Sequence, residues 1–231
     1  MMYRHLFFDL DHTLWDFNAN AKLTLTHLYH ELELKKYGVD DVDLFYRSYL
    51  IHNEKLWARF RNGYIKAGEL QWKRMWHTLL EFKIGDEKLA KIMGLKFFEQ
   101  LPQRTLLFPD TLSTLTYLKD KGYHLHLITN GFEETQQQKL KNSGIAVFFT
   151  EVITSEGSNS MKPKKEIFDY AMKKANALQK NSIMIGDSPE LDIQGAINAG
   201  IDQVYMDHLI KECTLNPTYT VHSLKELQLI F

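Results

Sequence analysis

The stretch LFFDLDHTL, residues 6–14, is a short apolar run that ends in two acids. An apolar run of this length, bounded by polar residues, is typical of a buried strand in a parallel sheet. Asp9 and Asp11 lie two residues apart at its end and therefore project toward the same side. Open α/β sheets place their ligand sites at the carboxyl ends of their strands. The stretch predicts the first strand of an α/β fold, with a functional site at its end.

Two patterns follow this strand along the chain. Residues 17–101 are helical in pattern, with amphipathic stretches at 21–37, 42–60, 69–82 and 88–100. After Pro102, apolar strands at 123–128, 148–153, 182–185 and 203–206 alternate with helices at 111–121, 133–142, 165–177 and 191–199. This alternation predicts an α/β fold with a Rossmann-like parallel sheet. We expect residues 1–16 and 102–231 to form that core and residues 17–101 to form an inserted α-helical cap domain.

Composition narrows the class of protein. Of the 231 residues 44% are hydrophobic and 25% charged, as in ordinary soluble domains, and the net charge is −1. We therefore expect no nucleic-acid partner and no membrane partner, since no apolar run reaches the roughly 18–20 residues that span a bilayer. The single cysteine, Cys213, excludes an intrachain disulfide. With no signal-peptide pattern at the start of the sequence, these features predict a cytoplasmic protein.

The pair Asp9 and Asp11 has a specific chemical interpretation. Two close carboxylates repel each other, and a hard divalent cation relieves that repulsion; Mg²⁺ prefers such oxygen ligands. One carboxylate can then act as a nucleophile that forms an acyl phosphate. The other can protonate the leaving oxygen and later activate water. The alternative is a pair of turn-forming or helix-capping aspartates, and the segment alone favours neither interpretation.

Two further polar clusters follow predicted strands or loops. Thr129 and Asn130 come after the strand at 123–128, where a hydroxyl, an amide and free N–H groups suit a phosphate oxyanion. Taken alone, a helix cap explains this pair better. Lys162 precedes a proline at a loop–helix junction, where it can supply fixed positive charge to a phosphoryl group. The alternative for residues 162–165, which hold three lysines, is a solvated basic helix start.

A last cluster follows the predicted strand at 182–185. Asp187 comes directly after it and is placed to complete a Mg²⁺ shell, and Asp192 lies about one helical turn later. Asp192 can orient that shell or Lys162 from the second sphere. A capped helix start, with Ser188 or Asp187 as the cap, is compatible with metal binding and is expected beside it.

The order and spacing of these clusters resemble the four motifs of the haloacid dehalogenase-like superfamily. The matching segments are residues 8–14, 128–131, 162–168 and 186–200. The resemblance covers essentially the whole chain, because the helical insert corresponds to the cap that this superfamily carries between its first and second motifs. It implies a hydrolase with an α/β core.

The resemblance also implies a role for each motif residue. Asp9 would be the nucleophile and a Mg²⁺ ligand, and Asp11 the acid/base, binding the metal through its backbone carbonyl. Asp187 would be a further Mg²⁺ ligand supported by Asp192. The phosphoryl group would be held by three residues from the second and third motifs: Thr129, Asn130 and Lys162.

Two positions sort the chemistry within the superfamily. Its dehalogenases lack the acid that stands here as Asp11, so Asp11 favours phosphoryl transfer. His12 stands where the family commonly has glycine, which leaves the local backbone conformation open. The remaining alternatives are a sugar-phosphate phosphatase, a phosphomutase, a 2-haloacid dehalogenase and a binding protein on a retained scaffold.

A closer resemblance concerns the substrate. Residues 53–57 and 60–63 of the cap, and residues 128–132 with 136–140, are similar to the noncanonical pyrimidine nucleotidases of this superfamily. That resemblance implies a Mg²⁺-dependent 5′-nucleotidase whose partner is a small phosphate ester, a nucleoside 5′-monophosphate, in a monomer or homodimer. It does not disclose the preferred base or sugar.

Aromatic residues near the first motif and in the cap are weaker candidates. Trp15 and Phe17 follow the first motif, and we expect them to line the mouth of the cap near a hinge that closes over the substrate. Trp57, with Phe60 and Tyr64, could stack on a base. The alternative, packing within a helical core, is the commoner use of aromatics at this spacing and is the one we favour for most of them.

Overall fold

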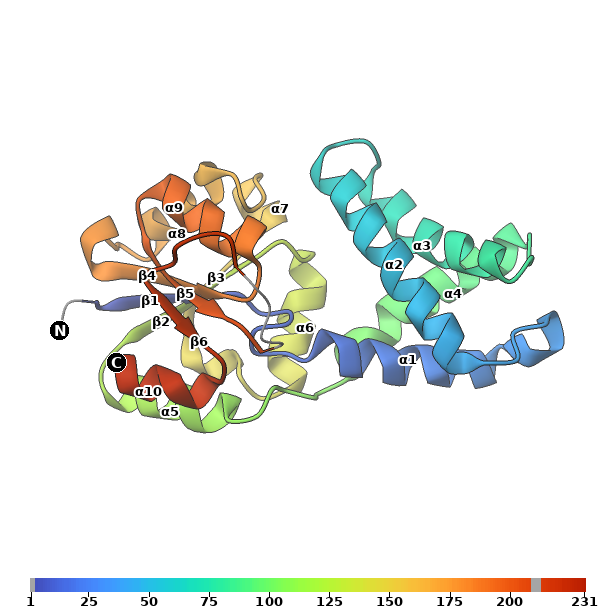
Figure 1. The fold of residues 1–231 in the computed structure, drawn as a ribbon, viewed down its shortest axis with the longest axis horizontal. Coiled ribbons are helices and arrows are strands. Elements are labelled where there is room, and N and C mark those ends of the chain that lie inside the picture. Colours follow the sequence, from blue (N-terminus) through green and yellow to red (C-terminus); the bar gives the residue numbers. More distant parts are fainter. Residues whose placement is uncertain (1–2, 209–212) are drawn as a thin grey trace. The chain divides into compact units, whose positions relative to one another are not determined.

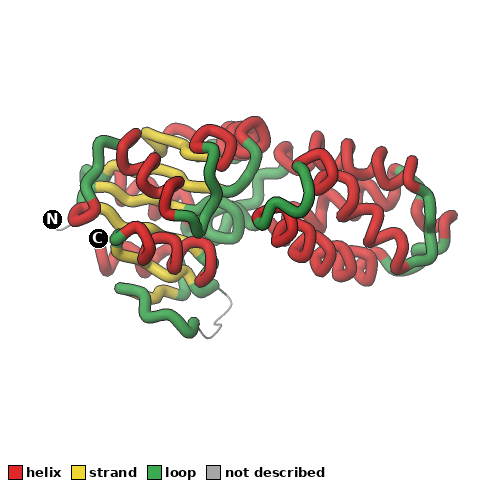
Figure 2. The backbone as a smooth tube through the Cα atoms, turned by 90° about the horizontal axis from the view of Figure 1, so that it is seen from above, coloured by secondary structure: helices red, strands yellow, loops and turns green. Residues whose placement is uncertain are grey.

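The computed structural model describes residues 3–208 and 213–231, and the chain divides into two compact units. One unit comprises Met1–Phe17 and Thr105–Phe231, and the other comprises Asn18–Arg104. The strands belong to the first unit, whereas the second is built from helices and loops (Figure 2). Among the described residues, no helix combines the length and the apolar character that crossing a membrane requires.

The first unit is organised around a parallel sheet. Its strands are β1 His5–Phe8, β2 His124–Thr129, β3 Phe149–Thr154, β4 Ser182–Gly186, β5 Asp202–Met206 and β6 Tyr219–Val221. They pair in parallel in the order β3-β2-β1-β4-β5-β6. The predicted Rossmann-like parallel sheet is therefore confirmed. The sequence pattern missed β6, because three residues are too short to display the strand period of two.

Helices cover both faces of this sheet (Figure 1). They are α5 Thr111–Asp120, α6 Glu133–Asn142, α7 Ser155–Ser158, α8 Lys165–Lys174, α9 Gln194–Ala199 and α10 Leu227–Ile230. On the face covered by α8 and α9, Phe7, Ile128 and Met184 from three strands form one buried cluster with residues of both helices. A Cβ on Gly195 would lie 2.5 Å from the Phe168 ring, so α8 and α9 approach each other closely at a glycine.

The second unit contains α1 Phe17–Glu31, whose first residue belongs to the other unit, α2 Val42–Arg61, α3 Ala67–Glu81 and α4 Glu87–Gln100. The helix expected at 21–37 instead ends at Glu31, and a 3₁₀ turn follows at Leu34–Tyr37. The break falls at Glu33, whose φ of 52° is left-handed. Further along, a Cβ on Gly94 of α4 would lie 2.8 Å from the backbone oxygen of Gln71, so α3 and α4 meet at this glycine.

A buried histidine lies on the α8 face of the sheet, near the amino ends of β1 and β2. His126 is 1% exposed, its ring stacks on Phe7 at 4.9 Å, and its Nε2 lies 3.1 Å from Nδ1 of His5. Its Nδ1 has no hydrogen-bond partner among the described side chains and backbone. Burial, with added repulsion from His5 and His124, lowers the pKa of His126 to about 3.

Replacing His126 with phenylalanine is expected to reduce the acid sensitivity of folding. Because the pKa of His126 is lowered in the folded state, His126 takes up a proton when the protein unfolds. The free energy of unfolding is therefore unaffected by His126 above the pKa that this residue has in the unfolded chain, and it falls as the pH drops below that value. Between pH 6 and 4 the wild type should lose about 1.4 kcal/mol per pH unit relative to the variant. Urea unfolding at several pH values measures this difference. His124→Phe, at an exposed position of the same strand, is the control, and an equal change in both variants would refute the assignment.

Candidate active site

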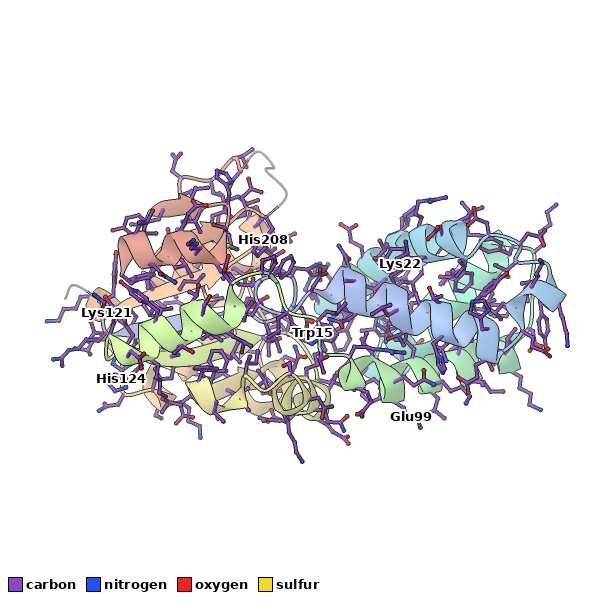
Figure 3. The ribbon with its side chains drawn as sticks, turned by 90° about the horizontal axis from the view of Figure 1, so that it is seen from below. Trp15, Lys22, Glu99, Lys121, His124 and His208 are labelled. Carbon is purple, nitrogen blue, oxygen red and sulfur yellow. The ribbon has the colours of Figure 1, made fainter. Side chains whose placement is uncertain are left out.

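The candidate site lies at a strand junction, where the central strands β1 and β4 end side by side. The chain runs from β1 outward through β2 and β3, then returns to β4 on the other side of β1 and continues through β5 and β6. Such a reversal opens a crevice at the carboxyl ends of the central strands. In Figure 3, Trp15 and His208 lie at this end of the α/β unit, and Lys121 and His124 lie at the opposite end. Asp9 follows β1 and Asp187 follows β4, on either side of the junction.

A buried lysine joins two of the predicted carboxylates. Lys162 Nζ lies 2.5 Å from Oδ1 of Asp9 and 2.6 Å from Oδ1 of Asp192, and its side chain is 2% exposed. Burial opposes the charge of Lys162, but Asp192 and Asp9 together raise the pKa of Lys162 above its ordinary value. Burial and the nearby Asp192 raise the pKa of Asp9 to about 7, against the opposing effect of Lys162. The lysine therefore carries a fixed positive charge beside Asp9.

Three carboxylates gather around this lysine. Ligand oxygens of Asp9, Asp187 and Asp192 lie within 4.8 Å of one another. Burial and the charges of Asp192 and Asp9 raise the pKa of Asp187 well above its ordinary value. Among the described residues, Lys162 is the cation that forms ion pairs with these carboxylates. When all three carboxylates are ionised, their negative charge therefore exceeds the positive charge of Lys162. Oxygen donors with excess negative charge fit a hard divalent cation such as Mg²⁺.

The cluster's hydrogen bonds distinguish its members. Both oxygens of Asp192 are engaged, one by Lys162 and the other by the Ser188 N–H at 3.0 Å. Thr13 Oγ1 lies 3.4 Å from Oδ2 of Asp9 and 3.2 Å from Oδ1 of Asp187. Asp9 Oδ2 and Asp187 Oδ1 are thus held less tightly, through these longer contacts with the Thr13 hydroxyl. Thr13, which the sequence interpretation did not select, links them across the strand junction.

The second-motif residues are brought to the same edge but engage different partners. The Asn130 amide accepts from the Lys162 N–H at 2.8 Å and donates to the Lys162 carbonyl at 3.0 Å, so it fixes the backbone of the lysine. Thr129 Oγ1 accepts from Gly131 N–H at 3.1 Å. Helix α6 begins after Phe132 and has no side-chain cap. The alternative interpretation of Thr129 or Asn130 as a helix cap is therefore wrong.

In the third and fourth motifs, too, particular residues are brought to the site. Of the three neighbouring lysines the structure brings Lys162 to Asp9, whereas Lys164 and Lys165 are exposed. Ser188 Oγ accepts from the Leu191 N–H at 3.2 Å and caps the short π-helical turn Pro189–Ile193. The expected helix cap thus exists beside the carboxylate cluster.

Asp11 has partners that the sequence interpretation missed. Lys139 Nζ lies 2.6 and 2.9 Å from its two carboxylate oxygens, and Gln136 Nε2 lies 2.9 Å from Oδ2. Burial would raise the pKa of Asp11, but the charge of Lys139 and hydrogen bonds from Lys139 and Gln136 hold it below its ordinary value. The available signal was spacing: Gln136 and Lys139 share the buried face of α6 with Leu140, an unusual location for a polar pair.

Trp15 and Phe17 lie beside this ion pair. Trp15 is fully buried and Phe17 is 8% exposed. Lys139 Nζ lies 4.4 Å from the Trp15 ring centroid and 5.9 Å from that of Phe17. Both rings lie against the Lys139 ammonium.

The cap aromatics divide into two kinds. Trp57 and Phe60 are half-buried and meet edge to face at 5.7 Å, which fits packing within the helical unit. Tyr64 is 74% exposed and does not belong to that packing. His12 adopts a φ of 66°, the left-handed conformation that glycine takes most readily and histidine tolerates, and its ring lies 5.1 Å from that of Phe17. The backbone at His12 therefore has the conformation expected at a glycine position.

Comparison with known proteins identifies the class. The family model for haloacid dehalogenase-like hydrolase matches residues 3–200. The chain therefore belongs to the haloacid dehalogenase-like hydrolases and is an enzyme of the phosphatase group within them.

Particular relatives are similar over nearly their whole length. The pyrimidine 5′-nucleotidase PynA of Streptococcus pneumoniae is 33% identical, over 98% of this chain and 94% of the relative. The pyrimidine 5′-nucleotidase YjjG of Escherichia coli is 30% identical, over 99% and 97%. The crystal structure of the putative HAD-hydrolase YfnB of Bacillus subtilis, described as bound to magnesium, superimposes with a TM-score of 0.89 at 28% identity, covering 100% of this chain and 99% of that one.

Proposed function

We propose that this enzyme is a Mg²⁺-dependent phosphomonoesterase that hydrolyses nucleoside 5′-monophosphates through an acyl phosphate formed on Asp9. The observation that carries the proposal is the arrangement around Asp9: a buried carboxylate flanked by the charged Lys162 and facing Asp187 at the strand junction. A nucleophile, a fixed cation for the phosphoryl oxygens and a carboxylate pair for a metal thus meet at one place.

In the first step Asp9 acts as the nucleophile. An oxygen of its carboxylate attacks phosphorus, the bond between phosphorus and the ester oxygen breaks, and the ester oxygen takes a proton from Asp11. Lys162 stabilises the negative charge on the phosphoryl oxygens, while Asn130 holds the backbone of Lys162 in place. Mg²⁺, held by Asp9, Asp187 and the Asp11 carbonyl, would neutralise phosphoryl charge and the repulsion between carboxylates.

The second step returns the enzyme to its starting state. Asp11, now ionised, takes a proton from water, whose oxygen attacks phosphorus as the bond to Asp9 breaks and phosphate leaves. The lowered pKa of Asp11 favours the ionised form that this second step requires, and it opposes the protonated form that the first step requires. Asp192 supports both steps through Lys162, because it holds the ammonium at 2.6 Å beside Asp9.

The substrate assignment rests on two nucleotidase relatives that match nearly the whole chain, including the helical unit. We assign the helical unit, Asn18–Arg104, the task of a cap that excludes water from the reaction. Tyr64 is the exposed aromatic of this unit that we assign to a base contact, whereas Trp57 packs against Phe60. A cytoplasmic location, where free nucleotides occur, is part of the same proposal.

A phosphate-release screen tests the substrate. Purified protein with Mg²⁺ is assayed against pyrimidine and purine 5′-monophosphates, triose and hexose phosphates, and 2-chloropropionate for halide release. We expect phosphate release from pyrimidine nucleotides and its loss when EDTA removes the metal. Hydrolysis of sugar phosphates without hydrolysis of nucleotides would refute the nucleotide assignment. Halide release that persists in EDTA would instead identify a dehalogenase.

A further inference from the structure

We propose that Gln136 and Lys139, on the buried face of α6, are positioning residues that act through Asp11 and Thr129. Together they hold the Asp11 carboxylate and set the direction in which the Thr129 hydroxyl donates. The inference rests on the proposed phosphatase function, in which Asp11 transfers protons at the leaving oxygen, and on the phosphoryl contact that the family resemblance implies for Thr129.

One amide group touches both of these side chains. Gln136 is fully buried, and its Nε2 donates to Asp11 Oδ2 at 2.9 Å and to Thr129 Oγ1 at 2.6 Å. A flipped amide would set its oxygen against the carboxylate, so the charge of Asp11 fixes which end of the amide faces it. The other end, Oε1, has no partner among the described residues. The amide is therefore oriented by its two contacts in the site.

These contacts determine what the Thr129 hydroxyl can do. Its oxygen accepts from Gln136 Nε2 and from the Gly131 N–H at 3.1 Å, which uses both lone pairs. The hydroxyl proton must then be donated to a third group. A phosphoryl oxygen is such an acceptor, so Gln136 makes Thr129 a donor toward the substrate.

The glycine of the second motif permits this arrangement. A Cβ on Gly131 would lie 2.2 Å from Nε2 and 2.4 Å from Cδ of Gln136. Any other residue at this position would push the amide away from Thr129 and Asp11. Gly131 is thus required for the close approach of Gln136 rather than for an unusual φ.

Lys139 fixes the other side of the carboxylate. It contacts both oxygens of Asp11, its side chain is 4% exposed, and the rings of Trp15 and Phe17 lie against its ammonium. Buried ion pairs contribute little net stability compared with apolar residues, because desolvation offsets the attraction. A rigidly held Asp11 explains the placement of a buried lysine here better than stability does.

The test uses leaving groups that differ in their need for a proton. The value of kcat/KM reports the steps up to formation of the phosphoenzyme. p-Nitrophenolate can leave without being protonated, whereas an alkyl oxygen must take up a proton as it leaves. Lys139→Met should lower kcat/KM for a nucleoside 5′-monophosphate about 10- to 100-fold, and that for p-nitrophenyl phosphate less than about threefold. Equal losses on both esters, or no loss on either, would overturn the proposal for Lys139.

Gln136 should behave differently because it also orients Thr129. Gln136→Met is expected to lower kcat/KM for both esters, with the larger loss on the nucleotide, and Gly131→Ala should reproduce this pattern. The controls lie on the same helix and are exposed: Gln137→Met and Lys141→Met should leave both values unchanged. A Gln136→Met enzyme with wild-type values would overturn the assignment of Gln136.

A double variant separates positioning from folding. In an Asp11→Asn background, Lys139→Met should cause no further loss of kcat/KM for the nucleotide, because the carboxylate that Lys139 holds is gone. As a single change, Lys139→Arg should keep most of the activity that Lys139→Met loses. The double variant also leaves no unpaired buried charge. An additional loss in the Asp11→Asn background would contradict action through Asp11.

The outcome for the wild type distinguishes the two proposals. If it hydrolyses a sugar phosphate and no nucleotide, the substrate assignment fails, and the sugar phosphate serves as the alkyl ester in the same comparison. If it hydrolyses no phosphate ester, the proposed function is refuted and this inference falls with it.

Discussion

Replacing Asp9 with asparagine is expected to abolish phosphate release. The amide cannot attack phosphorus, and it removes a charged ligand from the metal site while preserving the shape of the side chain. Removal of a nucleophile costs about 10⁴-fold or more in kcat. Steady-state phosphate release from a nucleoside monophosphate, measured with and without Mg²⁺, gives this value.

The fold should survive the change. Lys162 keeps its contact with Asp192 at 2.6 Å, so the buried ammonium stays paired. Asp169→Asn is the control, since Asp169 is exposed and pairs with Lys165 at 2.9 Å, away from the carboxylate cluster. An Asp9→Asn enzyme with unchanged kcat would refute Asp9 as the nucleophile.

Replacing Lys162 with methionine is expected to damage both activity and stability. The change removes the cation that Asp9 and Asp192 share and leaves their buried carboxylates uncompensated. Breaking a buried ion pair in this way costs about 3–5 kcal/mol of unfolding free energy. Loss of one fixed donor to the developing phosphoryl charge costs about 10²- to 10³-fold in kcat. Urea unfolding and phosphate release measure the two effects.

The neighbouring lysine provides a matched comparison. Lys164 is two residues away and exposed, so Lys164→Met should retain wild-type activity and stability. If Lys162→Met lost stability but kept its kcat, Lys162 would be a structural residue and not a phosphoryl contact. If Lys164→Met were the damaging change, the third-motif assignment would be wrong.

Sequence reasoning located the strands well because their positions are encoded locally. Asp9 and Asp187 each follow a short buried strand, and the parallel order brings those strand ends to one edge. For a similar reason, its position before the proline and outside the helix favoured Lys162 over its exposed neighbours as the phosphoryl contact. What could not be read is which atoms meet: that Asn130 holds the Lys162 backbone follows from the packing of two loops, not from either segment alone.

The partners of Asp11 show why other parts of the site were missed. Gln136 and Lys139 lie more than a hundred residues away, on a helix where polar residues would ordinarily face water. Their spacing puts them on one helix face with Leu140, but only the folded structure shows that this face is buried. Similarly, nothing local marks Glu33 for the left-handed conformation that ends the first long helix, because that conformation favours glycine or asparagine.

Chemical trapping shows directly whether Asp9 becomes phosphorylated during turnover. The enzyme is mixed with substrate and Mg²⁺, quenched, and treated with borohydride, which reduces an aspartyl phosphate to homoserine. Peptide mass spectrometry then locates the reduced residue. We expect homoserine at position 9 in the wild type, dependent on substrate and Mg²⁺. Phosphate release with Asp9 unreduced, or reduction at another carboxylate, would contradict the assignment of Asp9 as the nucleophile.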